Sequence, residues 1–65
     1  MEVTLNGDPC TIVNDLTIEK FLTTLDLGGK FAIEINQHII PRSEYSQTSL
    51  QPGDIIEVVQ AIGGG

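Results

Sequence analysis

Apolar and polar residues alternate along several short segments of the chain, and this alternation is the period of a β-strand with one buried face. With the turn residues between them, these segments predict strands at residues 2–5, 9–13, 31–36, 38–40 and 55–60. Each segment has a length that is ordinary for strands in small domains. We therefore expect a β-sheet that buries one of its faces.

Turn residues separate the predicted strands. Asn6-Gly7 is a strong hairpin signal because both residues tolerate a positive φ. Asn36-Gln37 is also predicted to be a turn. Residues 51–54, with the sequence Gln-Pro-Gly-Asp, have the pattern of a type II turn.

One segment has the periodicity of a helix. Apolar residues recur three and four positions apart through residues 18–25, which places them in a single stripe. Thr17 is the expected N-cap, because a threonine hydroxyl can accept a hydrogen bond from the first helical turn. Gly28 and Gly29 should end the helix, one of them as a left-handed C-cap.

Two prolines complete the predicted topology. Pro9 and Pro41 cannot donate to a neighbouring strand, so the strands that they touch should lie at the edges. The first and last strands then take the centre, parallel to each other and joined by a right-handed crossover. The order β-β-α-β-β-β, with the helix across one face of a mixed sheet, is the β-grasp, an α+β fold. We assign residues 1–60 to this domain and residues 61–65 to a flexible glycine tail.

Composition restricts the partners. Nine acidic residues and three basic residues give the chain a net charge of −6, which disfavours nucleic acid and anionic membrane surfaces. Partners with a basic docking surface would be favoured, although the acidic residues could serve solubility alone. With Cys10 as the only cysteine and no apolar run of membrane-spanning length, we expect a cytoplasmic protein and an isolated monomer.

The side chains offer little for catalysis. Cys10 and His38 are too few for a metal cluster; Cys10 is expected to be a buried thiol and His38 a surface side chain. Gly28-Gly29 neither follows a strand nor opens a helix, so it should not cradle a phosphate. The carboxylates are scattered without the spacing of an acid–base pair. We predict no intrinsic catalysis, no metal and no bound cofactor.

The end of the chain offers a different chemistry. Gly63, Gly64 and Gly65 follow the last predicted strand, and glycines can pass through a channel too narrow for other residues. Joining the Gly65 carboxylate to AMP would replace an oxide by a good leaving group. A sulfur nucleophile could then attack the acyl carbon and leave a thiocarboxylate. The alternative is a frayed end without a role.

Strand parity suggests a docking surface beside this tail. Ile55, Val59 and Ala61 should face away from the helix. Together with Ile62 they would form an exposed apolar patch that a partner could contact. The alternative is that they are ordinary surface aliphatics.

Several short motifs lie in the second half of the chain: Asn36-Gln37, Ile40-Pro41-Arg42, Gly53-Asp54, then Ile56, Val58 and the terminal Gly64-Gly65. With these motifs the chain resembles the ThiS family, the ubiquitin-like sulfur carriers of thiamine biosynthesis, over its whole length. The diglycine end alone is shared with ubiquitin and other carriers. Gly63 is a departure, since alanine often precedes the terminal pair in the family.

The resemblance implies a cycle that partners drive. A ThiF-type enzyme would adenylate the Gly65 carboxylate with MgATP, which the partner and not this chain would bind. A persulfide relay from a cysteine desulfurase would convert Gly65 to 1-thioglycine, a thiocarboxylate. That sulfur would pass to a ThiG-type thiazole synthase.

Two other functions stay open. A MoaD-type carrier for molybdopterin synthesis has the same fold and tail, although that family is usually longer than this chain. A β-grasp interaction module whose glycine end is incidental belongs to a different class. Removal of Gly65 would separate a carrier from such a module.

Overall fold

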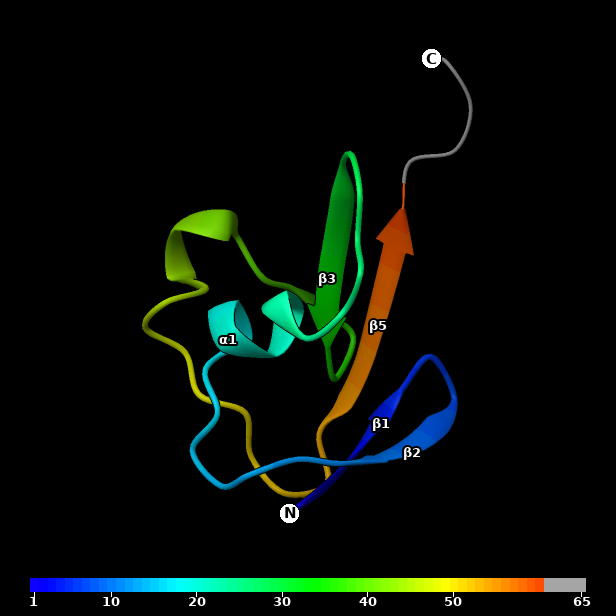
Figure 1. Ribbon diagram of the computed structural model, residues 1–65, viewed down its shortest axis with the longest axis vertical. Coiled ribbons are helices and arrows are strands. Elements are labelled where there is room, and N and C mark those ends of the chain that lie inside the picture. Colours follow the sequence, from blue (N-terminus) through cyan, green and yellow to red (C-terminus); the bar gives the residue numbers. More distant parts are fainter. Residues whose placement is uncertain (61–65) are drawn as a thin grey trace.

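Over residues 1–60, which the computed structural model describes, the chain forms a five-stranded mixed sheet with one α-helix against it (Figure 1). In chain order the elements are β1 (Glu2–Leu5), β2 (Asp8–Thr11), α1 (Ile18–Thr23), β3 (Phe31–Ile35), β4 (His38–Ile39), the 3₁₀-helix η1 (Arg42–Glu44) and β5 (Ile55–Gln60). The strand order across the sheet is β2-β1-β5-β3-β4. β1 and β5 run parallel, whereas the other neighbours are antiparallel. The predicted β-grasp topology is confirmed, with the two proline-marked strands at its edges.

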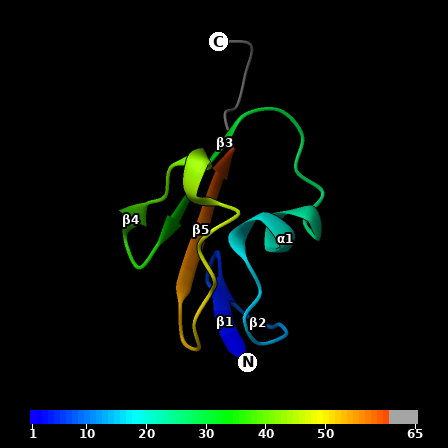
Figure 2. The ribbon, with the colours of Figure 1, turned by 90° about the vertical axis from the view of Figure 1, so that its left-hand side faces the viewer.

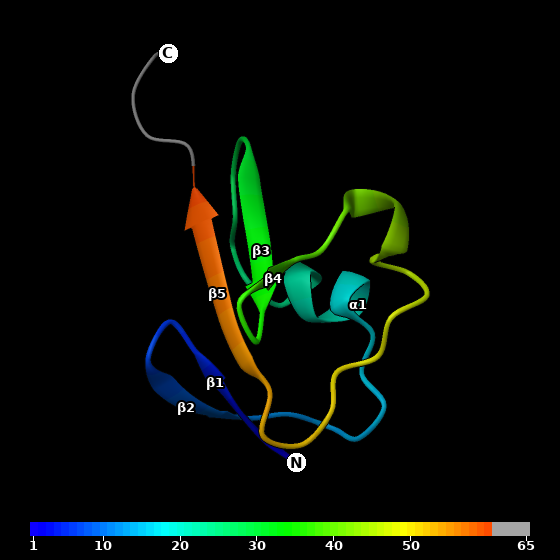
Figure 3. The ribbon, with the colours of Figure 1, turned by 180° about the vertical axis from the view of Figure 1, so that it is seen from behind.

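The core lies between the sheet and α1, which stands on one side of the sheet (Figure 2). The segment between η1 and β5 runs past α1 before it enters the sheet (Figure 3). It is fastened to the start of the helix, because Ile18 N donates to Thr48 O (2.9 Å) and Leu50 N donates to Leu16 O (2.8 Å). Burial of each large aliphatic side chain contributes about 1.5–3 kcal/mol. The buried core residues are Val3, Ile18, Phe21, Ile33, Ile35, Leu50 and Ile56.

The helix begins where the sequence predicts and ends earlier. Thr17 is the N-cap, and its hydroxyl accepts from Lys20 N at 3.2 Å. The helix stops at Thr23 with Thr24 as a right-handed C-cap, so the prediction of a helix through residues 18–25 is wrong at its end. The Thr23 and Thr24 hydroxyls each donate to the carbonyl three residues before them at 2.6 Å. These side-chain bonds compete with the backbone bonds that would extend the helix.

Neither glycine after the helix is its C-cap, which corrects the second part of that prediction. Gly29 does have a positive φ of 72°. However, it lies in the loop that leads to β3, well past the last helical turn. Its conformation therefore serves the loop and not the helix end.

The other differences are at strand ends. β2 begins at Asp8 and stops at Thr11, so it does not extend to Val13 as predicted. Ile12 still donates its N–H to Met1 O at 2.8 Å, but the chain then turns toward α1. Asn36 and Gln37, with φ of 51° and 72°, form the predicted turn between β3 and β4.

Candidate functional site

The predicted reactive terminus lies outside the described residues. This applies to the Gly65 carboxylate, to Gly63 and Gly64, and to the predicted docking residues Ala61 and Ile62. What the structure describes is β5, the strand that leads to this segment. The candidate site is therefore built from β5, its supports and the face of the sheet around it.

β5 is supported unequally by its two neighbours. β3 pairs with it along most of its length, from Ile35↔Ile56 to Phe31↔Gln60. β1 pairs with it only near its start, at Thr4↔Ile55 and Leu5↔Ile56. The second half of β5 consequently extends past the hairpin of β1 and β2 (Figure 1).

A side chain from the first hairpin turn holds β5 beyond the last β1 pair. Asn6, with a φ of 49°, donates its backbone N–H to Ile56 O at 2.9 Å. Its side-chain Oδ1 then accepts from Val58 N, also at 2.9 Å. The hydrogen bond to Val58 joins residues that are 52 positions apart in the sequence.

A second asparagine makes the same kind of contact at the start of β5. Asn36 Oδ1 accepts from Ile55 N at 3.0 Å, and its Nδ2 donates to Asp54 Oδ1 at 3.0 Å. Asp54 Oδ2 in turn accepts from Gln51 N at 2.8 Å. These contacts fasten the turn before β5 to the turn after β3.

The last described residue of β5 has a contact of its own. Gln60 Nε2 donates to Gly28 O at 3.1 Å, which joins the end of the strand to the loop after the helix. The strand that leads to residue 61 is thus held by backbone pairing to β3 and by side-chain bonds at Val58 and Gln60.

The sheet face opposite α1 is open and carries aliphatic side chains. Ile55 and Val59 point outward as predicted and are 53% and 56% exposed. Ile39 of β4, which is 71% exposed, lies opposite Glu34 and so shares this face. Ala32 lies opposite Val59 on the same face. We call these four residues, Ala32, Ile39, Ile55 and Val59, the outer patch.

Two carboxylates lie among the residues of the outer patch. Glu34 and Glu57 are direct cross-strand partners of β3 and β5. Like charges in this position destabilise a sheet. The same arrangement offers a strongly negative, partly apolar surface to a basic partner. The sequence alone does not place Ala32, Ile39 and this acidic pair on one surface, because it does not fix the register between the strands.

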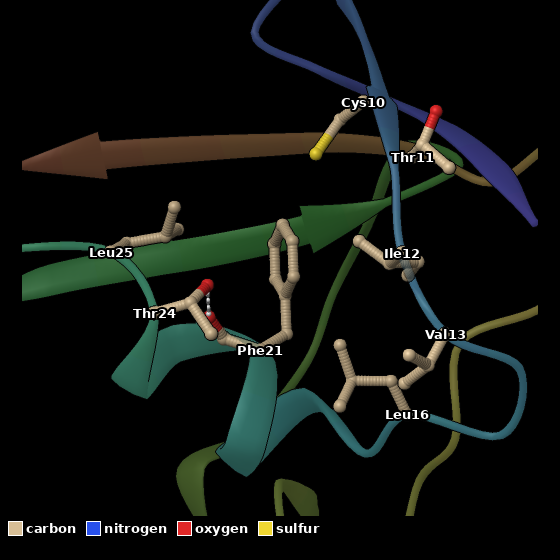
Figure 4. Close-up of a pocket in the computed structure, with 8 residues that line it drawn as sticks. All are labelled: Cys10, Thr11, Ile12, Val13, Leu16, Phe21, Thr24 and Leu25. Atoms are coloured by element: carbon tan, nitrogen blue, oxygen red, sulfur yellow. Dashed lines mark hydrogen bonds between the residues drawn. The ribbon is translucent and has the colours of Figure 1, made fainter.

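Two hollows are present on the described surface. One lies at the outer patch, has a volume of about 320 Å³ and is lined by Asn36, Gln37, Ile55 and Glu57. The other, of about 350 Å³, is an apolar groove between β2 and α1 (Figure 4). Cys10 directs its sulfur into this groove, which agrees with its predicted inward face, but its side chain is only half-buried and not buried as predicted.

Two features of other protein classes are absent from the part of the chain that the structure describes. Residues 1–60 contain no group of three or more His, Cys, Asp or Glu side chains that could hold a metal ion. In the same range, none of the helical structure reaches the length and apolar character that crossing a membrane requires.

Comparison with known proteins gives consistent matches. The ThiS family model matches residues 3–65. The sulfur carrier protein ThiS of Escherichia coli is 33% identical over 66 aligned positions that cover all of both proteins. The crystal structure of a thiamine biosynthesis protein, ThiS, from Geobacter metallireducens superposes with a TM-score of 0.85, at 28% identity and with both chains fully covered.

A longer protein matches as well. The thiazole synthase of Paramagnetospirillum magneticum is 36% identical over 66 positions, which cover all of this chain. The matched region is 20% of that protein, so the chain spans about a fifth of the length of this relative.

Proposed function

Because the chain belongs to the ThiS family, we propose that it carries sulfur for thiazole formation in thiamine biosynthesis and that Gly65 is the residue that is modified. A member of this family is a carrier and not itself an enzyme. The observation that supports the proposal most strongly is the end-to-end match with the E. coli sulfur carrier. The family model also reaches residue 65, which supports placing the modification there.

The proposed chemistry is acyl activation followed by sulfur transfer. The Gly65 carboxylate attacks the α-phosphorus of ATP, pyrophosphate leaves, and a glycyl adenylate forms. The terminal sulfur of a cysteine persulfide attacks the acyl carbon and displaces AMP, which gives an acyl disulfide. A second cysteine thiol then attacks the cysteine sulfur of this acyl disulfide. A disulfide forms between the two cysteines, and the thiocarboxylate of Gly65 leaves. MgATP is bound by the activating enzyme in this scheme.

We propose two principal partners, a ThiF-type adenylating enzyme and a ThiG-type thiazole synthase. The second is supported by the relative named thiazole synthase, part of which is similar to this whole chain. In that relative, a region similar to this carrier and a thiazole synthase would be parts of one polypeptide. The names of these relatives favour thiamine over the MoaD-type molybdopterin alternative.

The outer patch is the surface that we propose for docking. It is exposed, it flanks the strand that leads to residue 61, and it includes Ile55 and Val59. Glu34 and Glu57 give it negative charge, so the complementary partner surface would be apolar with basic side chains. We place this carrier in the cytoplasm, since Cys10 alone cannot form an intrachain disulfide.

Reconstitution tests the proposed function. The chain is incubated with MgATP, a ThiF-type enzyme, a cysteine desulfurase, cysteine, a ThiG-type synthase and its substrates, and thiazole formation is measured. We expect thiazole in the complete mixture and none with a variant that lacks Gly65. Equal thiazole formation by the shortened chain would refute the role of Gly65. Molybdopterin formed only when the large subunit of molybdopterin synthase and its substrate replace the ThiG-type synthase would instead support the MoaD-type alternative.

A further inference from the structure

We infer that Asn6 is a positioning residue for the reactive end of the chain. Its carboxamide fixes the second half of β5, the strand from which residues 61–65 continue. The inference rests on the proposed function, because it concerns how the Gly65 carboxylate is presented to the activating enzyme.

The hydrogen-bond pattern shows what the carboxamide replaces. In the parallel pair of β1 and β5, Thr4 N donates to Asp54 O and Asn6 N donates to Ile56 O. Continuing this ladder would bring the backbone carbonyl of Asn6 to Val58 N. However, Asn6 already belongs to the hairpin turn, with a φ of 49°, so the chain leaves the ladder there. Its side-chain Oδ1 accepts from Val58 N instead and extends the support of β5 past the end of β1.

The residue type matters for two separate reasons. The turn requires a residue that tolerates a positive φ, and glycine, asparagine and aspartate all do. The contact with Val58 requires an acceptor at the position of Oδ1, which glycine lacks and aspartate keeps. Asn6→Gly therefore keeps the turn and removes the contact with Val58, whereas Asn6→Asp keeps both.

The position of the contact explains why its loss should affect presentation of the terminus. On the side of β1, the hydrogen bond from Val58 N to Asn6 Oδ1 is the last contact that holds β5. Val58 lies two residues before Gln60. Beyond it, Val59 and Gln60 are paired with β3 alone, and Gln60 has its additional bond to Gly28. Without the Asn6 contact, the end of β5 could pivot about β3. A strand end that varies in direction lowers the fraction of docked carriers whose terminus reaches the reacting phosphate, because residues 61–65 continue from Gln60.

Docking should be affected much less than presentation. Ile39 lies on β4, and Ile55 begins β5, where Asn36 holds the strand. Val59 lies beyond the Asn6 contact but keeps its backbone pairing with Ala32 of β3. Loss of the Asn6 contact leaves these supports in place. The structure therefore predicts a change in kcat of adenylation with little change in KM for the carrier.

Asn36 supplies a matched control. It also sits in a turn with a positive φ of 51°, and its Oδ1 also accepts from a backbone N–H of β5. Its contact, however, is at Ile55, the opposite end of the strand from the tail. Asn36→Gly should lower stability without altering presentation of the terminus.

The test compares wild type, Asn6→Gly, Asn6→Asp and Asn36→Gly. Amide exchange of Val58 is measured by NMR, unfolding by urea, and kcat and KM by pyrophosphate release with the ThiF-type enzyme and MgATP. Asn6→Gly should speed Val58 exchange and lower kcat, each by about two- to tenfold, the range expected for one hydrogen bond. Asn6→Asp should keep both wild-type values. Asn36→Gly should keep the wild-type kcat, and any change should be confined to KM, because Asn36 lines the hollow at the outer patch.

Two results would overturn the inference while the proposed function stands. One is a wild-type kcat for Asn6→Gly. The other is an equal fall in kcat for Asn36→Gly, which would show that kcat follows stability and not the end of β5. If the wild-type chain is not adenylated at all, the proposed function fails, and the role of Asn6 in the reaction fails with it. Unchanged Val58 exchange in Asn6→Gly would overturn the contact itself.

Discussion

Glu34 and Glu57 lie directly opposite each other on the uncovered face of the sheet, in neighbouring strands β3 and β5. Two like charges at this position destabilise the pairing of the strands. Local choices that lower stability are expected at functional sites, where another requirement sets the residue type. The requirement that we propose is recognition of a basic surface on a partner enzyme.

Removing one of these charges should therefore separate stability from binding. Glu57→Gln should raise the free energy of unfolding by about 0.2–1 kcal/mol, because the cross-strand repulsion is lost. The same change should weaken binding to the ThiF-type enzyme at low salt, and the difference from wild type should shrink as salt screens the charges. Urea unfolding and titration calorimetry at two salt concentrations measure these effects.

Glu19→Gln is the control for net charge, since Glu19 is exposed on α1, on the other side of the sheet. It should leave affinity near the wild-type value. If both variants weaken binding equally, net charge and not the pair of glutamates drives docking.

Val59 should contribute to binding but hardly to stability. Because its side chain is 56% exposed, Val59→Ser should change the free energy of unfolding by no more than about 0.5 kcal/mol. A contact in the centre of an interface would cost more than about 1 kcal/mol of binding energy when it is removed. The dissociation constant for the ThiF-type enzyme, compared with wild type, measures this loss.

Val13→Ser provides the matched comparison for Val59→Ser. Val13 is 67% exposed and lines the groove between β2 and α1, away from the outer patch. We expect unchanged affinity for this variant. A greater loss at Val13 than at Val59 would move the docking surface to the helix side of the domain.

The turn before β5 depends on Gly53. Its φ of 83° is strained for any residue with a Cβ, although nothing lies within 4 Å of where that Cβ would be. Gly53→Ala should therefore cost about 1–2 kcal/mol through backbone conformation alone. Gly28→Ala, where the same space is open and φ is not positive, should be close to neutral in urea unfolding. Equal stability of the two variants would mean that the turn relaxes at little cost.

A side chain in the terminal segment should impede activation. Gly64→Ala adds one methyl group next to the reactive residue, and we predict slower adenylation because the active-site channel should fit glycine only. The amplitude and rate of pyrophosphate release measure the effect. A rate equal to that of wild type would argue against a narrow channel.

Several local features of this fold could be predicted from the sequence. Thr17 at the helix start, the turn at Asn36-Gln37 and the proline-marked edges follow from the preferences of single residues. The end of the helix did not follow from such preferences. Two threonine hydroxyls stop it before the glycines that were expected to do so.

The order of the strands was predicted, but contacts that depend on the register between strands were beyond the reach of the sequence. Strand parity placed Ile55 and Val59 outward, but only the register between β3 and β4 brings Ile39 onto the same face. The contact between Asn6 and Val58 likewise depends on where β1 ends beside β5. Neighbours of this kind are set by tertiary structure and carry no local signal.

The most direct test of the central claim is the intact mass of the chain after incubation with MgATP, a ThiF-type enzyme, a cysteine desulfurase and cysteine. We predict the mass increase of one oxygen replaced by one sulfur, with fragmentation placing the change on Gly65. An unchanged mass, or sulfur bound only at the Cys10 thiol, would contradict the account.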